Sequence, residues 1–425
     1  MAHLPQTMRA VVLRGQGFDN LALEDVPLPR PGPNQALVRV DAAGICASLV
    51  KMIAQGNDHT FLYGWDLSQF PSILGDEGSV TLMELGQNLQ AQNLQAQNRQ
   101  EKYSVGMRYV VQPAVDAVPV NHLERYRDNG AGISKIACGY TLPGHLAEYM
   151  LVPEEVFTAK CLIPIPDQTM ALAHAAIAEP ISCCVSGQFH HMHLQQEALT
   201  KPRKAVAGLK RGGTTVVIGL GSMGRMHVDV ALAQGTANLV ASDPMASRRD
   251  RALSDFAAKA KANNCQLKVV HPDDLAAEIH TSTGGRGADD LIIAVGHPKV
   301  IEASVPLLGK GGVANFFGGL KHGQEFVSLN ANRIHYDETV ITGSSGGTAW
   351  DIAQTLTWIS EGQIDPSRHI AKIGGLQHAI EMINDVREQR LDGKAVLYPH
   401  HQLKAAFEVP EWTAQDEKSL LTGAH

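Results

Sequence analysis

The stretch TTVVIGLGSMG, residues 214–224, decides the fold class of this chain. Its β-branched residues predict a buried strand, and Gly219, Gly221 and Gly224 follow in the pattern Gly-x-Gly-x-x-Gly. Glycines at this spacing build a tight turn, so that a pyrophosphate can approach the backbone at the N-terminus of the next helix. The glycines alone are a weak signal, because such turns also occur in other α/β proteins, but the helix predicted over residues 225–233 supplies the required context. The stretch therefore indicates a dinucleotide-binding unit.

An acidic residue follows at the distance that ribose recognition requires. A second strand predicted over residues 237–242 ends at Asp243, close to the spacing of about 20 residues at which a carboxylate accepts hydrogen bonds from an adenosine ribose. This carboxylate favours NAD(H), because it repels the extra phosphate of NADP(H). Three arginines that follow on a predicted helix leave NADP(H) open, although we expect them to be solvated: Arg248, Arg249 and Arg251. The residues expected to bind the dinucleotide are Gly219, Gly221, Ser222, Met223, Gly224 and Asp243.

Length and composition are those of an ordinary globular protein. The 425 residues suffice for two domains, because single cores rarely grow beyond roughly 250–300 residues. The net charge of −7 and the lack of a basic block argue against nucleic acid or a membrane as a partner. Six scattered cysteines do not form a disulfide framework, and the N-terminus has no signal-peptide pattern. We expect a reduced, cytoplasmic location.

The part of the chain before the glycine-rich stretch has the alternation of β-strands. Strands are predicted over residues 8–14, 36–43, 108–112 and 147–152. From about residue 170 to 345 strands and helices alternate, which predicts a parallel sheet with helices on both faces. A strand predicted over residues 393–398 resembles the early ones and is expected to return to the first domain. The expected domains are residues 1–183 (catalytic), 184–345 (dinucleotide-binding) and 346–425 (return to the catalytic domain and C-terminal tail).

Two segments carry no functional expectation. Residues 87–98 repeat QNLQA and are expected to form an exposed loop or an added helical turn, because they have little to bury. The tail, residues 403–425, is expected to be a surface helix that frays.

Three separate segments carry candidate metal ligands. Cys46 stands in the first, Asp76 and Glu77 in the second, and Glu179 in the third, just before a proline. A thiolate with two or three carboxylates can hold Zn²⁺ and leave a position open for water or substrate. Such an ion polarises a carbonyl or lowers the pKa of an alcohol, which assists hydride transfer to or from a nicotinamide. Spacing alone cannot group the segments, and a single cysteine is more often a small buried apolar residue.

Most of the chain resembles the zinc-dependent medium-chain alcohol and polyol dehydrogenases. The motifs that carry the resemblance are MRAV at 8–11, GIC at 44–46, Gly75-x-Glu77, VGMRYV at 105–110, Gly144-x-x-Ala147-Glu148-Tyr149, Glu179-Pro180, GLGSMG at 219–224 and GRGAD at 285–289. Within the family the chain is most similar to the sugar branch that includes L-sorbose-1-phosphate reductase. The features shared with that branch are CASLVK at 46–51, QPA at 112–114, EPISCC at 179–184, NFF at 315–317 and HY at 335–336 followed by GSSGG at 343–347. The resemblance implies an α/β protein with a β-rich GroES-like catalytic domain and a Rossmann cofactor domain, whose parallel sheet is doubly wound.

The resemblance also implies roles for single residues. Cys46 would be a zinc ligand, and Glu77 a ligand or near-ligand. Glu179 would be the carboxylate of the polyol branch that binds zinc directly or through water. Ser48 would pass the proton of the substrate hydroxyl outward. Lys51 stands where many relatives have a relay histidine, so it would serve the relay, bind a phosphate or hydroxyl of the substrate, or simply be a solvated surface lysine.

One departure from the family pattern concerns the metal. The family motif is Gly-His-Glu, and this chain has Gly75-Asp76-Glu77. Asp76 can replace the histidine as an oxygen ligand, but its charge makes a bound water or alcohol less acidic. The alternative is a site that binds zinc weakly or not at all, and we expect a retained, altered site. The lobe that holds structural zinc in the family needs four cysteines, whereas residues 113–140 contain only Cys138, so we expect no structural zinc.

Two further clusters are interpreted as structural. The histidines at the end of a predicted helix, His190, His191 and His193, are expected to face solvent or to cap carbonyl groups. Cys183 and Cys184 are expected to pack rather than to act as a redox pair, because neighbours on a helix cannot both point into one site.

The leading hypothesis is an NAD(H)-dependent, zinc-assisted oxidoreductase that interconverts a secondary alcohol and a ketone on a polyol, sugar or sugar phosphate. Two alternatives stay open: a metal-free NAD(P)H-dependent reductase of carbonyls or enones, motivated by Asp76, and a non-catalytic dinucleotide-binding protein. The expected cofactors are NAD(H) and one catalytic zinc ion. The resemblance also implies a homodimer or homotetramer.

Overall fold

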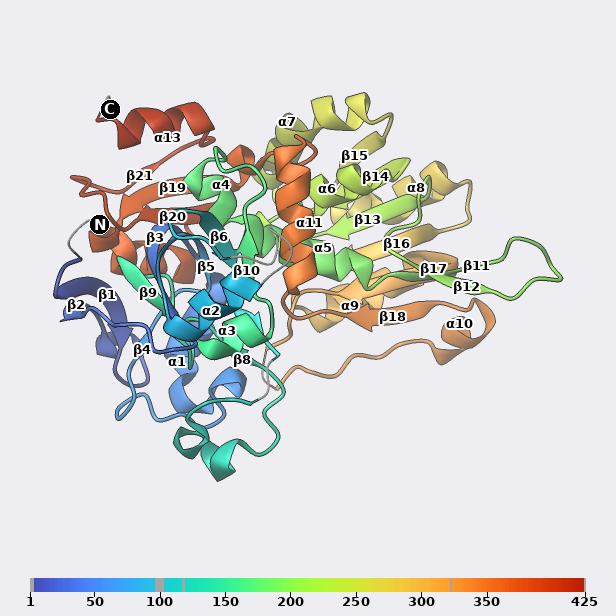
Figure 1. Cartoon of the computed structure of the whole chain (residues 1–425). Coiled ribbons are helices and arrows are strands. Elements are labelled where there is room, and N and C mark those ends of the chain that lie inside the picture. The colour runs from blue at the N-terminus through green and yellow to red at the C-terminus, as the bar shows by residue number, and fades with distance from the viewer. Residues whose placement is uncertain (1–3, 96–102, 117–118, 322, 424–425) are drawn as a thin grey trace. The chain divides into compact units, whose positions relative to one another are not determined.

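The computed structural model describes residues 4–95, 103–116, 119–321 and 323–423, which form two compact units (Figure 1). Unit 1 comprises the residues up to Pro180, Thr348–Ser360, and the residues from Pro366 onward. Unit 2 comprises Ile181–Gly347 and Glu361–Asp365. Unit 1 is rich in β-strands and unit 2 alternates strands with helices, which confirms the mixed α/β class predicted from the sequence.

The centre of unit 2 is a six-stranded parallel sheet in the order β15-β14-β13-β16-β17-β18. Its strands are β13 (Thr214–Ile218), β14 (Asn238–Ser242), β15 (Gln266–Val270), β16 (Ala288–Ile293), β17 (Leu308–Phe316) and β18 (Val340–Gly343). From β13 the chain builds the sheet outward first through β14 and then, after a crossover, through β16. Ligands bind beyond the carboxyl ends of the strands at such a switch point, and the glycine-rich stretch begins there.

Helices cover both faces of this sheet. Neighbouring residues of a strand point to opposite sides, so apolar neighbours such as Val216 and Val217 require a covering layer on each side. Val217 of β13 packs in one apolar core with residues of α6 (Ser222–Gln234) and α7 (Ala246–Ala262). Val216 packs in a second core with residues of α8 (Pro272–Thr283) and α9 (Pro298–Ser304). The doubly wound sheet predicted from the sequence is thereby confirmed. Other elements are α5 (Ala178–Phe189), which begins in unit 1, β11 (Met192–Gln195), β12 (Lys204–Ala207) and α10 (Ala331–Tyr336).

Unit 1 is built on an eight-stranded sheet in which seven strands follow the order β10-β6-β5-β3-β20-β19-β21 and β9 pairs with β3. The strands are β3 (Ala36–Ile45), β5 (Glu77–Leu85), β6 (Arg108–Val111), β9 (Tyr149–Val152), β10 (Leu162–Pro164), β19 (Ile370–Gly375), β20 (Lys394–Tyr398) and β21 (Phe407–Glu408). β20 pairs antiparallel with β3, with Ala395 opposite Ile45. The alternating segment near the end of the chain therefore returns to the first sheet, as its pattern predicts.

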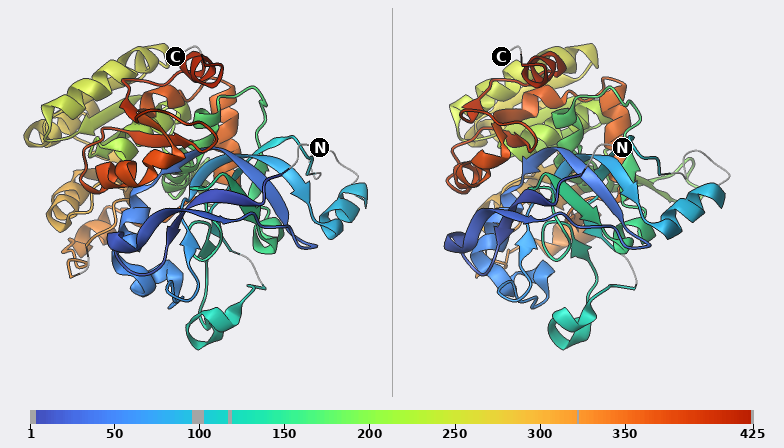
Figure 2. Two further views of the ribbon diagram at one scale, coloured as in Figure 1. Left: turned by 90° about the vertical axis from the view of Figure 1, so that its left-hand side faces the viewer. Right: turned by 60° about the vertical axis from the view of Figure 1, so that its left-hand side comes forward.

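Smaller sheets and short helices complete unit 1. β1 (Thr7–Leu13) pairs with β2 (Leu21–Pro27) and β4 (Ser72–Ile73), and β7 (Ala114–Val115) pairs with β8 (Ile136–Ala137). The helices are α1 (Ala47–Gln55), α2 (Gln87–Gln95), α3 (Glu154–Thr158), α4 (Leu172–Ala176), α11 (Ala349–Ser360), α12 (Ala379–Arg387) and α13 (Ala414–Leu421). Both views of Figure 2 show α2 standing off from the strands. Residues 87–95 of the polar repeat thus form a helix, which is one of the two forms expected for them. Residues 96–98 lie outside the described residues. No helix in the described ranges is long and apolar enough to span a bilayer.

The described part of the C-terminal tail is anchored rather than frayed. Glu417 of α13 is buried and accepts the backbone N–H groups of Leu172 and Ala173 at 2.6 and 2.8 Å. It also accepts the hydroxyl of Tyr398 at 2.7 Å. The first N–H groups of a helix have no partner within it, so this carboxylate caps α4 from a distant part of the chain. The predicted helix is present as α13, but the expectation that it frays is wrong in the described residues, because the polarity of the sequence did not reveal that Glu417 has buried partners.

Candidate functional site

Three predicted ligands of unit 1 meet at one point. Cys46 is the N-cap of α1, Asp76 precedes β5, and Glu77 is the first residue of β5. The Cys46 sulfur and one carboxylate oxygen from each acid all lie within 4.8 Å of one another. The sheet register brings them together, since Gly44 of β3 lies opposite Glu77. A Cβ at residue 44 would overlap Oε2 of Glu77, so a side chain there would displace this carboxylate.

A buried lysine that sequence reasoning missed lies in the same cluster. Lys394 is the first residue of β20, and its Nζ forms an ion pair with Oε1 of Glu77. Burial by itself lowers the pKa of Lys394, but attraction to the Glu77 carboxylate raises it above its ordinary value. The only hint in the sequence was the alternation of residues 393–398. That pattern assigned the strand to the first domain but did not show what its lysine would contact.

The cluster is buried and contains more acidic groups than basic ones. Burial raises the pKa of the Cys46 thiol well above its ordinary value, and Asp76 raises it further. Burial also raises the pKa values of Asp76 and Glu77, although Ser48 opposes the rise at Asp76 and Lys394 opposes it at Glu77. Three acidic groups therefore share one lysine, so bound protons or a further cation have to supply the rest of the balance.

The donor atoms of the cluster fit a zinc ion. Oδ1 of Asp76 and Oε2 of Glu77 are buried, and apart from the thiol of Cys46 they have no hydrogen-bond donor among the described residues. One weakly donating S–H cannot satisfy two carboxylates, whereas a cation would account for both orphaned oxygens. Sulfur and carboxylate oxygen are both zinc ligands. The residues that would hold the ion are Cys46, Asp76 and a carboxylate of Glu77 or Glu179.

Glu179 lies near this cluster but outside the group of three. It is buried in the first turn of α5, and its charge acts on the Cys46 thiol and on Tyr140. Its role as a ligand, direct or through water, stays a prediction.

The hydroxyl of Ser48 joins the cluster to a tyrosine. Ser48 Oγ donates to Oδ2 of Asp76 at 2.8 Å, and the Ser48 backbone N–H points to Sγ of Cys46 at 3.4 Å. Tyr140 hydrogen-bonds Ser48, and its pKa is raised well above its ordinary value by burial and by Asp76. The rings of Tyr140 and His59 lie 5.4 Å apart. Polar groups therefore lead from the predicted ligands to His59.

Lys51 is an exposed residue of α1. Burial and then the charge of Lys51 lower the pKa of His59. Within the described ranges, no hydrogen bond or ion pair joins Lys51 directly to Cys46, Asp76 or Glu77. Lys51 instead lies close enough to His59 for its charge to act on the imidazole, and the His59 ring lies beside Tyr140.

In unit 2 the glycine-rich stretch forms the predicted strand, turn and helix. Gly219 has φ 91°, and a Cβ on Gly224 would overlap the carbonyl oxygen of Gly219. A Cβ at residue 221 would have no protein atom closer than Nη1 of Arg248, at 4.0 Å, which leaves room for phosphate. Ser222 and Met223 begin α6, and Oγ of Ser222 is buried without a partner among the described residues.

Asp243 lies directly after β14, where its carboxylate is held by backbone groups. Oδ2 accepts the N–H of Leu220 and Oδ1 that of Met245, both at 2.8 Å. The three arginines after it contact protein groups instead of being simply solvated. Their partners are Asp243 for Arg248, the backbone carbonyls of Asp243 and Pro244 for Arg249, and Asp255 for Arg251.

The histidine-rich segment differs in part from its expectation. His190 caps a helix as expected, with Nδ1 2.7 Å from the carbonyl oxygen of Ser186. The expectation is wrong for His191 and His193, which are buried and both contact Asp290. A helix continued past residue 190 would have exposed them, but the chain turns into β11 and directs them inward.

The fold is that of an alcohol dehydrogenase of the class that uses a nicotinamide cofactor. Family models agree: the alcohol dehydrogenase GroES-like domain matches residues 32–167, and the zinc-binding dehydrogenase domain matches residues 222–361. The chain belongs to the zinc-dependent medium-chain dehydrogenase/reductase family, and it is an oxidoreductase.

Relatives of the chain include a dehydrogenase and a reductase that are named for phosphorylated substrates. Mannitol-1-phosphate 5-dehydrogenase of Aliivibrio fischeri is 28% identical, over 94% of this chain and 88% of the relative. L-Sorbose 1-phosphate reductase of Klebsiella pneumoniae is 27% identical, over 88% of this chain and 84% of the relative. The solved structure of 2R,3R-butanediol dehydrogenase from Bacillus subtilis matches with a TM-score of 0.70 and 20% identity, over 92% of this chain and 100% of that one, which shows the shared fold.

Proposed function

We propose that this protein is an NAD(H)-dependent, zinc-assisted dehydrogenase that interconverts a secondary alcohol and a ketone on a polyol, sugar or sugar phosphate. The observation that carries the proposal is the convergence of Cys46, Asp76 and Glu77 on one buried point, with two orphaned carboxylate oxygens. The names of the two relatives describe phosphorylated substrates, which supports a sugar phosphate or polyol phosphate for this chain as well.

The cofactors would supply the hydride carrier and a Lewis acid at the reacting oxygen. The protein's own residues would move the proton. Ser48 Oγ donates to Oδ2 of Asp76, so its hydroxyl can accept the proton of a substrate hydroxyl while its own proton moves to that carboxylate. Lys394 would hold Glu77 in an ion pair and so offset part of the charge that Asp76 adds.

Lys51 and His59 would bind an anionic group of the substrate. Nδ1 of His59 accepts the backbone N–H of Phe61 at 3.2 Å, which leaves the Nε2–H of the neutral ring free to donate. An ammonium and an imidazole N–H are both suitable donors to phosphate oxygens. Lys51→Met should therefore raise KM for a phosphorylated substrate and leave KM for the unphosphorylated polyol nearly unchanged. Equal effects on both substrates would contradict this role.

The remaining expectations become part of the proposal. Asp243 supports NAD(H), because its carboxylate lies directly after β14 and repels a 2′-phosphate.

The six cysteines, all in the described ranges, form no disulfide, which supports a reducing compartment such as the cytoplasm. β18 is the end strand of its sheet among the described residues, and an open edge favours pairing with a second copy. Light scattering should give a mass of two or four chains.

Zinc analysis combined with turnover assays tests the proposed reaction. The substrates are a panel of polyols, keto-sugars and their phosphates, assayed with NAD(H) and NADP(H). We expect zinc-dependent turnover that Cys46→Ala abolishes and that Cys265→Ala, in the apolar core of unit 2, retains. Full activity after exhaustive chelation would instead support the metal-free reductase. Tight NADH binding without turnover on the whole panel would support a non-catalytic protein.

A further inference from the structure

A second cluster of metal-binding side chains lies inside unit 2. His191 directly precedes β11 and His193 belongs to it, so the two residues stand two positions apart in extended chain and point to the same side. The intervening Met192 is exposed, and both histidines are buried. His-x-His in a strand thus directs two imidazoles inward, toward β16 of the central sheet.

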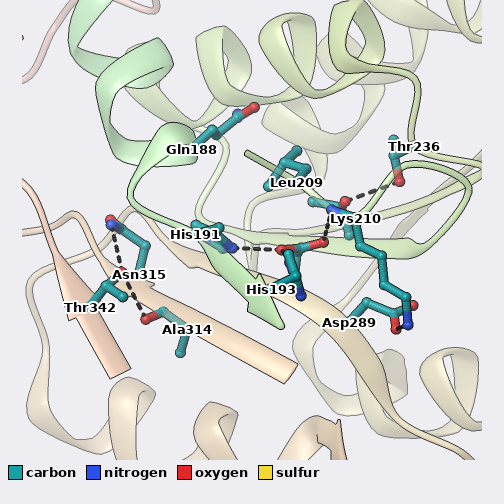
Figure 3. A network of polar contacts seen from close by, with 12 residues as sticks. Gln188, His191, His193, Leu209, Lys210, Thr236, Asp289, Ala314, Asn315 and Thr342 are labelled. Atoms are coloured by element: carbon teal, nitrogen blue, oxygen red, sulfur yellow. Dashed lines mark hydrogen bonds and ion pairs between the residues drawn. The ribbon is translucent and has the colours of Figure 1, made fainter. Parts of the chain in front are cut away.

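The two imidazoles converge on a single carboxylate oxygen of β16. Nδ1 of His191 lies 2.6 Å and Nε2 of His193 lies 2.8 Å from Oδ1 of Asp290. Figure 3 labels the two histidines and Lys210 in this network. Oδ2 of the same carboxylate accepts the backbone N–H of Lys210 at 2.9 Å. The carboxylate is therefore oriented by a fixed backbone group, which is the kind of outer partner that ligating carboxylates have.

We propose that His191, His193 and Asp290 form a second divalent-metal site, in the cofactor-binding unit and separate from the Cys46 cluster, with zinc as its ion. Two imidazole nitrogens and one carboxylate oxygen are zinc ligands, and three protein ligands leave the fourth position for water. The expected absence of structural zinc concerned the cysteine lobe at residues 113–140, and this site uses different residues.

The geometry requires only a small adjustment to admit the ion. Zinc at about 2.0–2.1 Å from its ligands holds them roughly 3.3 Å apart in a tetrahedron, so each imidazole has to withdraw by roughly 0.5–0.7 Å. The hairpin that β11 forms with the antiparallel β12 can supply this movement, because all of β12 and most of β11 are exposed. His193 has 8% of its side chain exposed and marks the side from which an ion enters.

The tautomer of His191 that metal binding requires breaks no other side-chain hydrogen bond of this residue among the described residues. A metal takes the lone pair of Nδ1, so the proton of His191 has to sit on Nε2. Nε2 of His191 has no hydrogen-bond partner among the described residues, so nothing fixes the proton on Nδ1 except Asp290 itself. The ion would replace the shared hydrogen bonds and fasten the exposed hairpin to the central strand β16.

Metal stoichiometry of the full-length chain tests the proposal. The protein is equilibrated with zinc, freed of loose metal, and analysed for zinc per chain. We expect two ions in the natural protein, one in Cys46→Ala/Asp76→Asn, one in His191→Gln/His193→Gln, and none in the combined variant. His190→Gln is the matched control, because this neighbouring histidine only caps a carbonyl, and it should keep two ions.

Cobalt gives a second readout that activity does not influence. Cobalt at the Cys46 site has a thiolate ligand and should show a sulfur-to-metal charge-transfer band in the near ultraviolet. Cobalt at the histidine site lacks sulfur and should show only the visible bands of a tetrahedral ion, best seen in Cys46→Ala/Asp76→Asn. Asp290→Asn, which keeps the shape of the side chain, should remove these visible bands, and circular dichroism with NADH binding shows that each variant is folded.

The outcomes separate this proposal from the proposed enzymatic function. One zinc ion that the Cys46 variant abolishes and the histidine variant retains would overturn the second site and leave the catalytic zinc in place. One ion with the opposite dependence would support the second site and overturn the zinc-assisted reaction. Visible cobalt bands that persist in Asp290→Asn would also overturn the proposal.

Discussion

Replacing Lys394 with methionine isolates the charge balance of the Cys46 cluster. The Lys394 side chain is 6% exposed and that of Glu77 is 0% exposed, so water cannot compensate for a missing partner. Removing one member of a buried ion pair costs about 3–5 kcal/mol, because it leaves the other charge buried and alone. We therefore expect Lys394→Met to lower the free energy of unfolding of unit 1 by about 3–5 kcal/mol. The double variant Lys394→Met/Glu77→Gln should recover at least half of this loss, since no unpaired charge remains.

Urea unfolding followed by tryptophan fluorescence measures this effect on unit 1 alone. The chain has four tryptophans, Trp65, Trp350, Trp358 and Trp412, and all lie in unit 1. The experiment is done in the presence of a chelator, so that metal binding does not contribute.

An exposed ion pair of the same unit provides the control. Arg30 lies 3.9 Å from Glu84 with both side chains largely in solvent, so Arg30→Met should change stability by less than about 0.5 kcal/mol. The reasoning is refuted if Lys394→Met also changes stability by less than about 1 kcal/mol. It is equally refuted if the double variant loses the full sum of the two single losses.

Three further predictions concern other parts of the chain. Gly221→Ala should weaken NADH binding, measured by fluorescence titration, by at least about tenfold with an unchanged thermal midpoint, because its Cβ meets no protein atom but enters the phosphate space. Gly224→Ala should lower both the affinity for NADH and the thermal midpoint, because its Cβ overlaps the carbonyl oxygen of Gly219. Equal thermal midpoints of the two variants would refute this expected difference between Gly221 and Gly224. Glu417→Gln should destabilise unit 1 by about 1–3 kcal/mol in urea unfolding, because an amide nitrogen would face buried donors; no change would show that the cap is dispensable. Burial lowers the pKa of His145 to about 4, so the unfolded chain binds a proton at acidic pH that the folded chain refuses, and stability falls as the pH drops below about 6.5. His145 should therefore cost about 2 kcal/mol between pH 7 and pH 5, a loss that His145→Asn should not show.

Local patterns predicted much of the fold. The β-branched run at residues 214–218 became β13, and the glycines after it became the predicted turn into α6. The alternation of residues 393–398 became β20. These predictions succeeded because strand periodicity and glycine spacing are properties of neighbouring residues, and the buried faces they require are visible in a short window.

Contacts between distant residues lay beyond such patterns. The ion pair of Lys394 with Glu77 joins positions 317 residues apart, and the cap of α4 by Glu417 joins positions 245 residues apart. In each case a polar side chain is buried because a distant segment supplies its partner. The wrong expectation for His191 and His193 has the same cause, since their partner Asp290 lies 99 and 97 residues further along the chain.

The sequence by itself determined that this chain binds a dinucleotide, belongs to the zinc-dependent medium-chain dehydrogenases, and departs from their metal motif at Asp76. Those conclusions depend on residue types at fixed short spacings. Only the tertiary structure decided that Cys46, Asp76 and Glu77 lie within 4.8 Å of one another, that Lys394 partly balances their charge, and that two histidines turn inward onto Asp290. The physical reason is that charge balance and metal geometry depend on which strands lie side by side, and the register between distant strands is set by packing of the whole sheet.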